Sequence, residues 1–345
     1  MVAEMSPYER VMTAVLLGVP DRIPVVPAAP AFAIRQAGYK FGEVLRDPGK
    51  FVHAQVTMRN ALGVDALFDL CNSAMVGEAL GATVCISEDS PPDIDESSTL
   101  SYDEIFALEF ASIGSKARVP FLLEVIARLK EAGGADVPVF ALAAPPFRLA
   151  ATLLGAENLY MDLIRRPEEV CRLVQKCTPP AIEYALAVID AGADVVWIPD
   201  PMGGATVLSK RFYEKFNLPY LKQVCAAIKG RGGKIVFHAC GKWNDRLDLL
   251  VDHVDGLHVG AECDLGTLKR DLGSTTSLMG NVKSTDTMLF GTPRDCEDAA
   301  LACLHQAGQG GGFLLSPDCA VPPATAADNM RALVRASIRT GLSAQ

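Results

Sequence analysis

The stretch KIVFHACG, residues 234–241, predicts a buried β-strand that ends in side chains able to ligate a metal. Its first five residues are rich in β-branched and aromatic side chains, which is the composition of a strand. Glycines at positions 230, 232 and 233 come before it and indicate a helix-to-strand turn, because a phosphate-binding loop would follow a strand. We therefore expect a strand over Lys234–His238, with His238 and Cys240 at its carboxyl end.

Short apolar runs alternate with longer helical patterns on both sides of this strand. Seven more runs predict strands, and they are Ile23–Pro27, Asp65–Leu70, Val139–Ala143, Asp194–Pro199, Gly256–Val259, Ser277–Asn281 and Gly312–Ser316. Helical patterns long enough to cross back over a sheet include Pro167–Ala191, Lys210–Lys229, Trp243–Val251 and Thr325–Gly341. Such alternation is typical of parallel strands joined by crossover helices. About eight β–α units predict a closed (β/α)8 barrel of the α/β class.

A helix signal stands near the start of the chain, at Ser6-Pro7-Tyr8-Glu9. Ser6 is placed to cap the helix, and Glu9 lies three residues later, which completes a capping box. We expect an amphipathic helix that ends before Gly18, as an N-terminal helical extension of the barrel. The acidic stretch Glu88–Glu96 predicts a surface excursion. Since no flexible linker divides the chain, we expect a single domain over residues 1–345.

Composition excludes several classes of protein. The formal net charge is −9 over 345 residues, and no basic stripe offers a nucleic acid its usual contacts. Neither a signal peptide nor an apolar run long enough for a membrane span is evident, so we expect a cytoplasmic protein. The ten cysteines are scattered rather than densely spaced, as expected for small core residues in a reducing compartment.

A barrel of this type places its active site on the loops at the carboxyl ends of its strands. That rule selects seven residues, which are Asp69, Asp200, His238, Cys240, Glu262, Asn281 and Cys319. One imidazole and two thiols from this set would hold zinc and leave a fourth position open, as catalytic zinc sites do. The alternatives are a buried strand-end pair without metal, or a structural zinc closed by Cys263. Asp69 and Asp200 could equally cap helices or brace loops.

Several segments of the chain resemble the uroporphyrinogen decarboxylase superfamily. They are Glu9-Arg10-Val11, Pro20–Pro24, Arg35–Gly38, Asp200–Tyr220 and Gly312–Pro323. The resemblance spans nearly the whole chain and implies the same barrel. It also implies substrate-binding roles for Arg35, Met202 and Asn281, and it adds a homodimer to the expectations.

The superfamily has two branches that carry out different chemistry. Decarboxylases of tetrapyrrole carboxylates hold their acidic substrate with two arginines, an aspartate, a tyrosine, a serine and a histidine. Arg35 is present here and Asp69 matches the aspartate. The other positions are occupied by Tyr39, Ala151, Pro201 and Cys319. A decarboxylase is therefore the alternative interpretation, and a zinc-bearing binding subunit without catalysis is a third.

The second branch contains the corrinoid-dependent methyltransferases, such as the methylcobamide:coenzyme M methyltransferases. These proteins carry His-x-Cys and a distant Cys as zinc ligands, which correspond here to His238, Cys240 and Cys319. The resemblance implies zinc-dependent transfer of a methyl group between a corrinoid (cobalamin), carried by a separate protein, and a small thiol, tetrahydrofolate or methyl ether. It also implies a catalytic role for Glu262 as a displaceable fourth zinc ligand, with Asp264, Cys263 or water as competitors.

Overall fold

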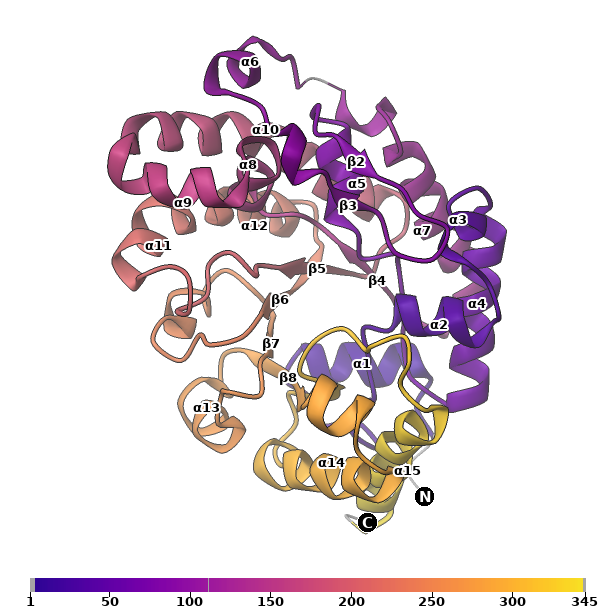
Figure 1. The fold of residues 1–345 in the computed structure, drawn as a ribbon. Coiled ribbons are helices and arrows are strands. Elements are labelled where there is room, and N and C mark those ends of the chain that lie inside the picture. Colours follow the sequence, from indigo (N-terminus) through magenta and orange to yellow (C-terminus); the bar gives the residue numbers. More distant parts are fainter. Residues whose placement is uncertain (1–3, 111, 344–345) are drawn as a thin grey trace.

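The protein is described by a computed structural model that covers residues 4–110 and 112–343. Its main sheet contains seven parallel strands in the order β1-β4-β5-β6-β7-β8-β9, curled so that helices cover its outer face (Figure 1). These strands are β1 Leu67–Phe68, β4 Val139–Leu142, β5 Val195–Pro199, β6 Lys234–Ala239, β7 Gly256–Val259, β8 Ser277–Val282 and β9 Phe313–Pro317.

An eighth segment closes the sheet into a barrel. Val26 N–H donates to Leu315 C=O (2.9 Å), and Leu315 N–H donates to Pro24 C=O (2.9 Å). On the other side, Asp65 N–H donates to Val25 C=O (2.9 Å), just before β1. The predicted strand Ile23–Pro27 is thus reduced to one parallel bridge, because its prolines have no N–H to extend the ladder. The predicted (β/α)8 barrel is confirmed.

Helices surround this barrel (Figure 1). The helices are α1 Pro7–Val15, α2 Pro30–Gln36, α3 Phe41–Val44, α4 Pro48–Leu62, α5 Ser73–Glu78, α6 Tyr102–Ala107, α7 Val119–Gly133, α8 Pro146–Leu154, α9 Ala156–Arg165, α10 Pro167–Asp190, α11 Lys210–Phe216, α12 Leu218–Gly230, α13 Leu265–Leu272, α14 Pro293–Ala307 and α15 Ala327–Ser343. Shorter turns of helix are Glu96–Ser98, Ile113–Ser115, Leu247–Leu249 and the π-helix η4, Ser284–Leu289.

The N-terminal capping box is confirmed, because Ser6 and Glu9 each bind the other's backbone N–H at the start of α1. The surface excursion at Glu88–Glu96 is also confirmed. It contains part of an antiparallel hairpin of β2 (Val84–Cys85) and β3 (Asp93–Ile94), and residues 85–91 between them are exposed.

Two helix predictions were wrong in detail. The stretch Lys210–Lys229 is broken at Asn217 into α11 and α12, because the Asn217 side chain binds Asp200 (2.7 Å) and Pro219 follows. The stretch Trp243–Val251 is not an α-helix and contains only the turn Leu247–Leu249. At the start of this stretch, Trp243 Nε1–H donates to Cys240 C=O (3.0 Å), just after the end of β6.

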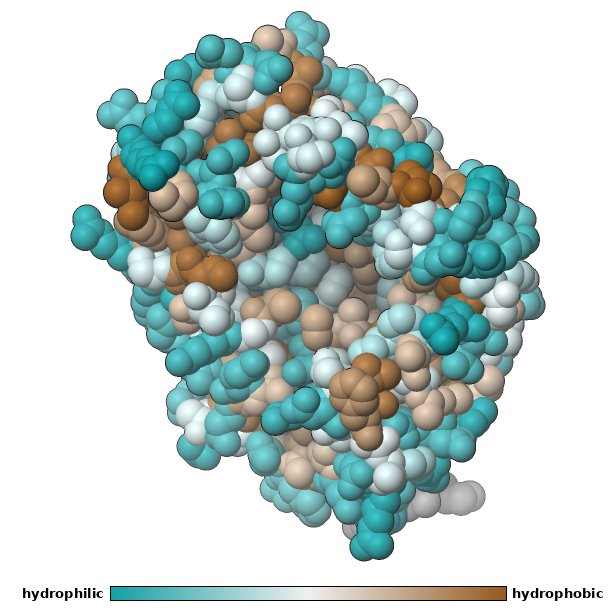
Figure 2. Space-filling view, in the orientation of Figure 1, coloured by the Kyte–Doolittle hydropathy of each residue, from teal (hydrophilic) through white to brown (hydrophobic). Residues whose placement is uncertain are grey.

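The barrel interior is packed with side chains, and strands β4, β5, β7 and β9 are buried along their whole length. Burial on both faces is what parallel strands covered by helices require. Figure 2 shows a face of the molecule that is hollowed near its centre. In the part of the chain that the structure describes, no helix combines the length and the apolar character needed to cross a membrane.

Candidate metal centre

Three metal-ligating side chains converge at the carboxyl ends of the strands. His238 lies in β6, Cys240 follows β6 directly, and Cys319 follows β9 by two residues. One ligand atom from each lies within 4.8 Å of the other two. Among the described residues, this is the one group of three or more His, Cys, Asp or Glu side chains found with such spacing.

The imidazole of His238 is held by aromatic rings. It is stacked on Trp197, with ring centroids 5.0 Å apart and planes inclined by 19°, and it lies 4.3 Å from the ring of His258. His238 is 2% exposed, and neither of its ring nitrogens has a hydrogen-bond partner among the described residues. Two buried nitrogens without a partner carry a desolvation cost, which a bound ligand would remove from at least one of them.

His258 connects this stack to the strand that precedes Cys319. Its Nε2 lies 2.8 Å from Pro317 C=O, and its Nδ1 lies 3.3 Å from Trp197 Nε1. The carbonyl can only accept and the indole can only donate, so His258 carries its proton on Nε2 and is neutral. Burial, followed by the neighbouring His238, lowers the pKa of His258 well below its ordinary value, which agrees with this assignment.

The two thiols are coupled to each other. Their mutual hydrogen bond lowers the pKa of Cys319, where His238 adds to the effect. The same hydrogen bond, with burial, raises the pKa of Cys240. A lowered pKa favours the thiolate form of Cys319. Thiolates are the form of cysteine that binds metals.

Loops from three strands fix the position of Cys319. Asp318 accepts hydrogen bonds from the Ser284 backbone N–H (2.8 Å) and from the Ser284 hydroxyl. Its other oxygen faces the Ala261 N–H (3.4 Å). The Ser284 hydroxyl oxygen in turn accepts from the Cys319 N–H (3.1 Å). The chain segments after β7, β8 and β9 are thus connected directly around this cysteine.

The predicted acid Asp200 organises the loop after β5. It is fully buried and accepts from Met202 N–H (3.0 Å), Gly203 N–H (2.8 Å) and Asn217 Nδ2–H (2.7 Å). A Cβ on Gly203 would lie 2.6 Å from the Asp200 carboxylate and 2.8 Å from Trp243, so this turn needs glycine. These contacts fit the bracing interpretation of Asp200. Its catalytic role stays a prediction.

Asp69 lies at the carboxyl end of β1, as predicted, and it is 1% exposed. Its carboxylate accepts from the Cys71 backbone N–H (2.9 Å) and the Leu142 N–H (3.1 Å), which ties β1 to β4. Burial raises the pKa of Asp69 to about 6. These bonds also support bracing, and a catalytic role for Asp69 stays a prediction.

The candidates for a fourth ligand differ in their hydrogen bonds and in their exposure. Asp264 caps α13 by accepting from Thr267 N–H (2.7 Å), and Cys263 is buried with its pKa raised to about 11 by that burial. Glu262 is exposed. A Cβ added to Gly260 would lie 2.8 Å from the Glu262 carboxylate and would also meet the Gly241 carbonyl oxygen, so these two groups lie on the same side of Gly260. Gly241 directly follows Cys240, so of the two carboxylates Glu262 is the one that lies near the backbone after Cys240.

The three predicted substrate-binding residues lie in different surroundings. Asn281 donates to Gly260 C=O (3.0 Å) and Cys263 C=O (2.9 Å), so its amide holds the loop after β7. Met202 is half-buried, and its carbonyl accepts from the Tyr160 hydroxyl (2.9 Å). Arg35 is exposed on α2, which follows the barrel-closing segment. Their roles in binding substrate stay predictions.

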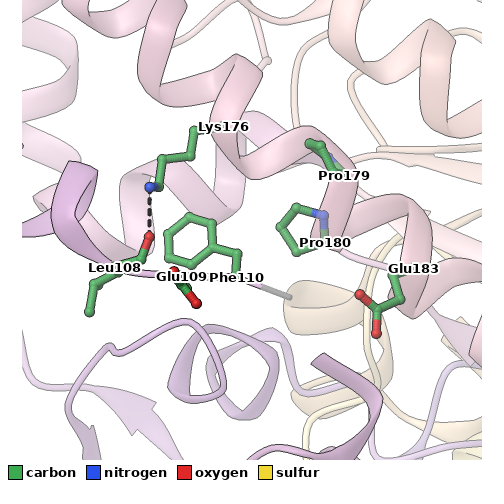
Figure 3. A pocket seen from close by; sticks show the side chains of 7 residues that line it. All are labelled: Leu108, Glu109, Phe110, Lys176, Pro179, Pro180 and Glu183. Carbon is green, nitrogen blue, oxygen red and sulfur yellow. Dashed lines mark hydrogen bonds between the residues drawn. The ribbon is translucent and has the colours of Figure 1, made fainter. Parts of the chain in front are cut away.

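One surface cavity is lined by none of the three cluster residues. It has a volume of about 450 Å³ and lies between α10 and the segment after α6 (Figure 3). Lys176 donates across it to Leu108 C=O (2.7 Å), and Pro179, Pro180 and Glu183 line its other side. None of the predicted site residues lines this cavity.

The sequence interpretation missed the residues that support the cluster. His258, Trp197, Ser284 and Asp318 are not among the predicted site residues. Strand register is the signal that identifies the two rings beside His238. In β7, His258 pairs with His238 of β6. In β5, Pro199 pairs with His238, and Trp197 lies two residues before Pro199. Residues that share a register position and a face of the sheet contact one another.

The chain is similar to known proteins over almost its full length. The methylcobamide:CoM methyltransferase MtbA of Methanosarcina acetivorans is 26% identical over 341 residues, which cover 96% of this chain and 98% of that protein. A uroporphyrinogen decarboxylase of Myxococcus xanthus is 29% identical, with 91% and 93% covered. Among solved structures, a methyltransferase from Methanosarcina mazei has a TM-score of 0.85 at 24% identity, covering 98% of this chain and 99% of that one.

These similarities confirm the expected relationship to the superfamily and to its methylcobamide:CoM methyltransferase branch. The uroporphyrinogen decarboxylase (URO-D) family itself matches residues 6–339, which include the whole barrel. This chain therefore belongs to the URO-D family.

Proposed function

We propose that this protein is a zinc-dependent methyltransferase that moves a methyl group between a corrinoid protein and a small methyl acceptor or donor. The observation that carries the proposal is the convergence of His238, Cys240 and Cys319 at the mouth of the barrel. Relatives of the same length are named methylcobamide:CoM methyltransferases, which supports the same reaction class.

The three residues fit a zinc ion. Zinc takes imidazole nitrogen at about 2.0 Å and thiolate sulfur at about 2.3 Å, and ligand atoms within 4.8 Å of one another can surround one such ion. His238 offers a nitrogen that no described residue occupies, and the thiols offer at least one thiolate. Zinc held in this way would lower the pKa of a substrate thiol or polarise the oxygen of a methyl ether.

The protein's own residues would keep this site open on one side. Three ligands leave one position of a tetrahedron for substrate, and Glu262 is the carboxylate best placed to occupy that position between turnovers. The ring of Trp197, stacked on His238, and the tilted ring of His258 hold the imidazole of His238. The Ser284 hydroxyl, bound to Asp318, accepts from the backbone N–H of Cys319. Asp69 joins the end of β1 to β4, and Asp200 braces the loop after β5.

A corrinoid protein is the proposed partner. The relatives' names include methylcobamide, which supports a corrinoid presented from outside, and the site faces the loops at one end of the barrel. A single domain, a homodimer and a cytoplasmic location remain part of the proposal. Ten cysteines without disulfides agree with a reducing compartment.

The alternative function is decarboxylation of a tetrapyrrole carboxylate, which the similarity to named decarboxylases supports. The cluster favours methyl transfer, because Cys319 stands at the position where decarboxylases carry histidine and its thiol meets Cys240. Arg35 is the one remaining arginine of the expected clamp, and it is exposed.

Metal analysis with an activity assay tests the proposal. We expect about one zinc per chain, and methyl transfer from methylcobalamin to a thiol. Cys319→Ser should lose both, whereas Cys85→Ser, which changes an exposed cysteine in β2, should keep both. Decarboxylation by metal-free protein would support the alternative, and bound zinc without turnover of either substrate would indicate a binding subunit.

A further inference from the structure

Asn281 bridges the two ends of the turn that follows β7. It lies in β8, which stands between β7 and β9 in the sheet (Figure 1). Its Nδ2 donates to Gly260 C=O (3.0 Å) and to Cys263 C=O (2.9 Å). Its Oδ1 accepts from the Cys303 thiol, whose sulfur is 3.7 Å away. An asparagine amide has two N–H donors, so both are used within the protein and neither is left to bind a substrate.

The turn is also closed by its own backbone. Cys263 N–H donates to Gly260 C=O (3.0 Å), which is the hydrogen bond of a tight four-residue turn. Within the turn, Glu262 C=O accepts from Asn244 Nδ2–H (3.3 Å). Asn281 therefore fixes a preformed turn to β8 at both of its ends, and the backbone of Glu262 is fixed with it.

The turn lies against the backbone that follows Cys240. A Cβ on Gly260 would lie 2.6 Å from the Gly241 carbonyl oxygen and 3.2 Å from the Gly241 nitrogen. Two backbone segments approach this closely where glycine leaves room, and here both positions are glycine. Since Gly241 directly follows Cys240, a shift of the turn away from β8 would also change the surroundings of this candidate ligand.

The carboxylate of Glu262, in contrast, is free to move. In the described part of the chain, no residue forms a hydrogen bond or an ion pair with it. It is exposed, and it is not one of the three ligand atoms that lie within 4.8 Å of one another. Rotation of the side chain must therefore bring it to the cluster, and a fixed backbone lowers the conformational entropy that this movement costs.

We propose that Asn281 is a positioning residue, which holds the turn Gly260–Cys263 so that Glu262 can bind and release the metal of the cluster. Asn281 acts through Glu262 and touches neither the metal nor the substrate. Hydrogen bonds that orient metal ligands typically contribute about 10- to 100-fold to metal affinity. This inference rests on the proposed function for the presence of zinc, and its test reads the binding of the metal rather than turnover.

A double-mutant cycle in zinc affinity separates positioning from a general effect on the fold. We expect Asn281→Ala to weaken zinc binding about 10- to 100-fold, because the Glu262 carboxylate is no longer held within reach of the ion. In a Glu262→Gln background the same substitution should change the affinity by less than about two-fold. Competition with a chromophoric chelator measures all four proteins, and circular dichroism checks that they fold. Asn281→Ser, which keeps one donor, should lose less affinity, and it replaces the Ala variant if that variant does not fold.

Cobalt(II) gives a spectroscopic readout of the same role. Its visible absorption depends on the number and the type of its ligands, so Glu262→Gln should change the spectrum of the cobalt-loaded protein. Asn281→Ala should change the spectrum in the same direction, and the two substitutions together should add nothing further. Asn158→Ala is the matched control, because it removes an amide hydrogen bond to Leu154 C=O (3.0 Å) in the outer helices α8 and α9. It should leave zinc affinity and the cobalt spectrum unchanged.

The outcomes distinguish this inference from the proposed function. Losses of affinity that add up in the double variant, or a cobalt spectrum that Asn281→Ala leaves unchanged, would overturn the inference alone. A Glu262→Gln variant with the affinity and spectrum of the natural protein would do the same. Coupled losses without methyl transfer to a thiol or from a methyl ether would sustain the role of Asn281 and reject the proposed function. A protein that binds neither zinc nor cobalt would overturn both.

Discussion

The imidazole of His238 lies flat against the indole of Trp197, with ring centroids 5.0 Å apart and an interplanar angle of 19°. A metal-ligating histidine is usually oriented by a hydrogen bond from its second nitrogen. Here neither nitrogen of His238 has a hydrogen-bond partner among the described residues, and stacked rings orient the imidazole instead.

Trp197→Ala should therefore lower zinc affinity by about 10- to 100-fold, the range seen when outer-shell partners are removed. Trp197→Phe keeps an aromatic face and loses the N–H that points to His258 Nδ1, so we expect a smaller loss. Competition with a chromophoric chelator measures the affinity, and circular dichroism checks that both variants fold. A folded Ala variant with unchanged affinity would show that the stack does not orient His238.

Gly203→Ala should destabilise the protein by about 1–3 kcal/mol, the usual cost of overpacking. The new Cβ would lie 2.6 Å from the Asp200 carboxylate and 2.8 Å from Trp243. Gly230→Ala is the matched control, because nothing lies within 4 Å of its added Cβ and it ends α12. Urea unfolding of both variants gives the comparison, and equal stabilities would contradict the packing argument.

Asp69 should make stability depend on pH between about 4 and 6. Burial raises its folded-state pKa to about 6, whereas an unfolded aspartate titrates near 3.9. The folded protein thus binds more protons in this window, so the contribution of Asp69 to stability falls as pH rises through it, by about 3 kcal/mol in total.

Asp69→Asn removes this titration. We expect the stability of the natural protein, measured relative to the Asn variant by urea unfolding, to decrease between pH 4.5 and pH 7.5. A difference that stays constant over this range would mean that Asp69 does not titrate as expected.

Removal of zinc should expose the two cluster thiols to reagents. Cys85 is the one cysteine in the exposed class, whereas Cys240 and Cys319 are half-buried. In a Cys85→Ser background, treatment with a strong chelator should add about two rapidly reacting thiols per chain, because metal-bound sulfur is protected. Counting with a chromogenic disulfide reagent checks this, and an unchanged count after verified metal loss would argue against ligation by Cys240 and Cys319.

The barrel could be predicted because hydrophobic periodicity is local. Runs such as Lys234–Ala239 and Val195–Pro199 show their strand character in their own side chains, and the helical patterns between them require parallel strands. Where a segment is shaped by remote partners, prediction was wrong. Trp243 is an example, because its ring packs against Tyr213 and Phe237. Asn217 is another, because its side chain binds Asp200.

The sequence by itself determined that His238, Cys240 and Cys319 would lie together, because they stand at or just after the ends of two predicted strands and the carboxyl ends of barrel strands meet. Only the tertiary structure decided which residues support the site. His258 and Trp197 contact His238 through strand register, and the Ser284 hydroxyl, bound to Asp318, holds the backbone N–H of Cys319. Such relationships join residues that are far apart along the chain, and they depend on burial and distance, which no local pattern of side chains encodes.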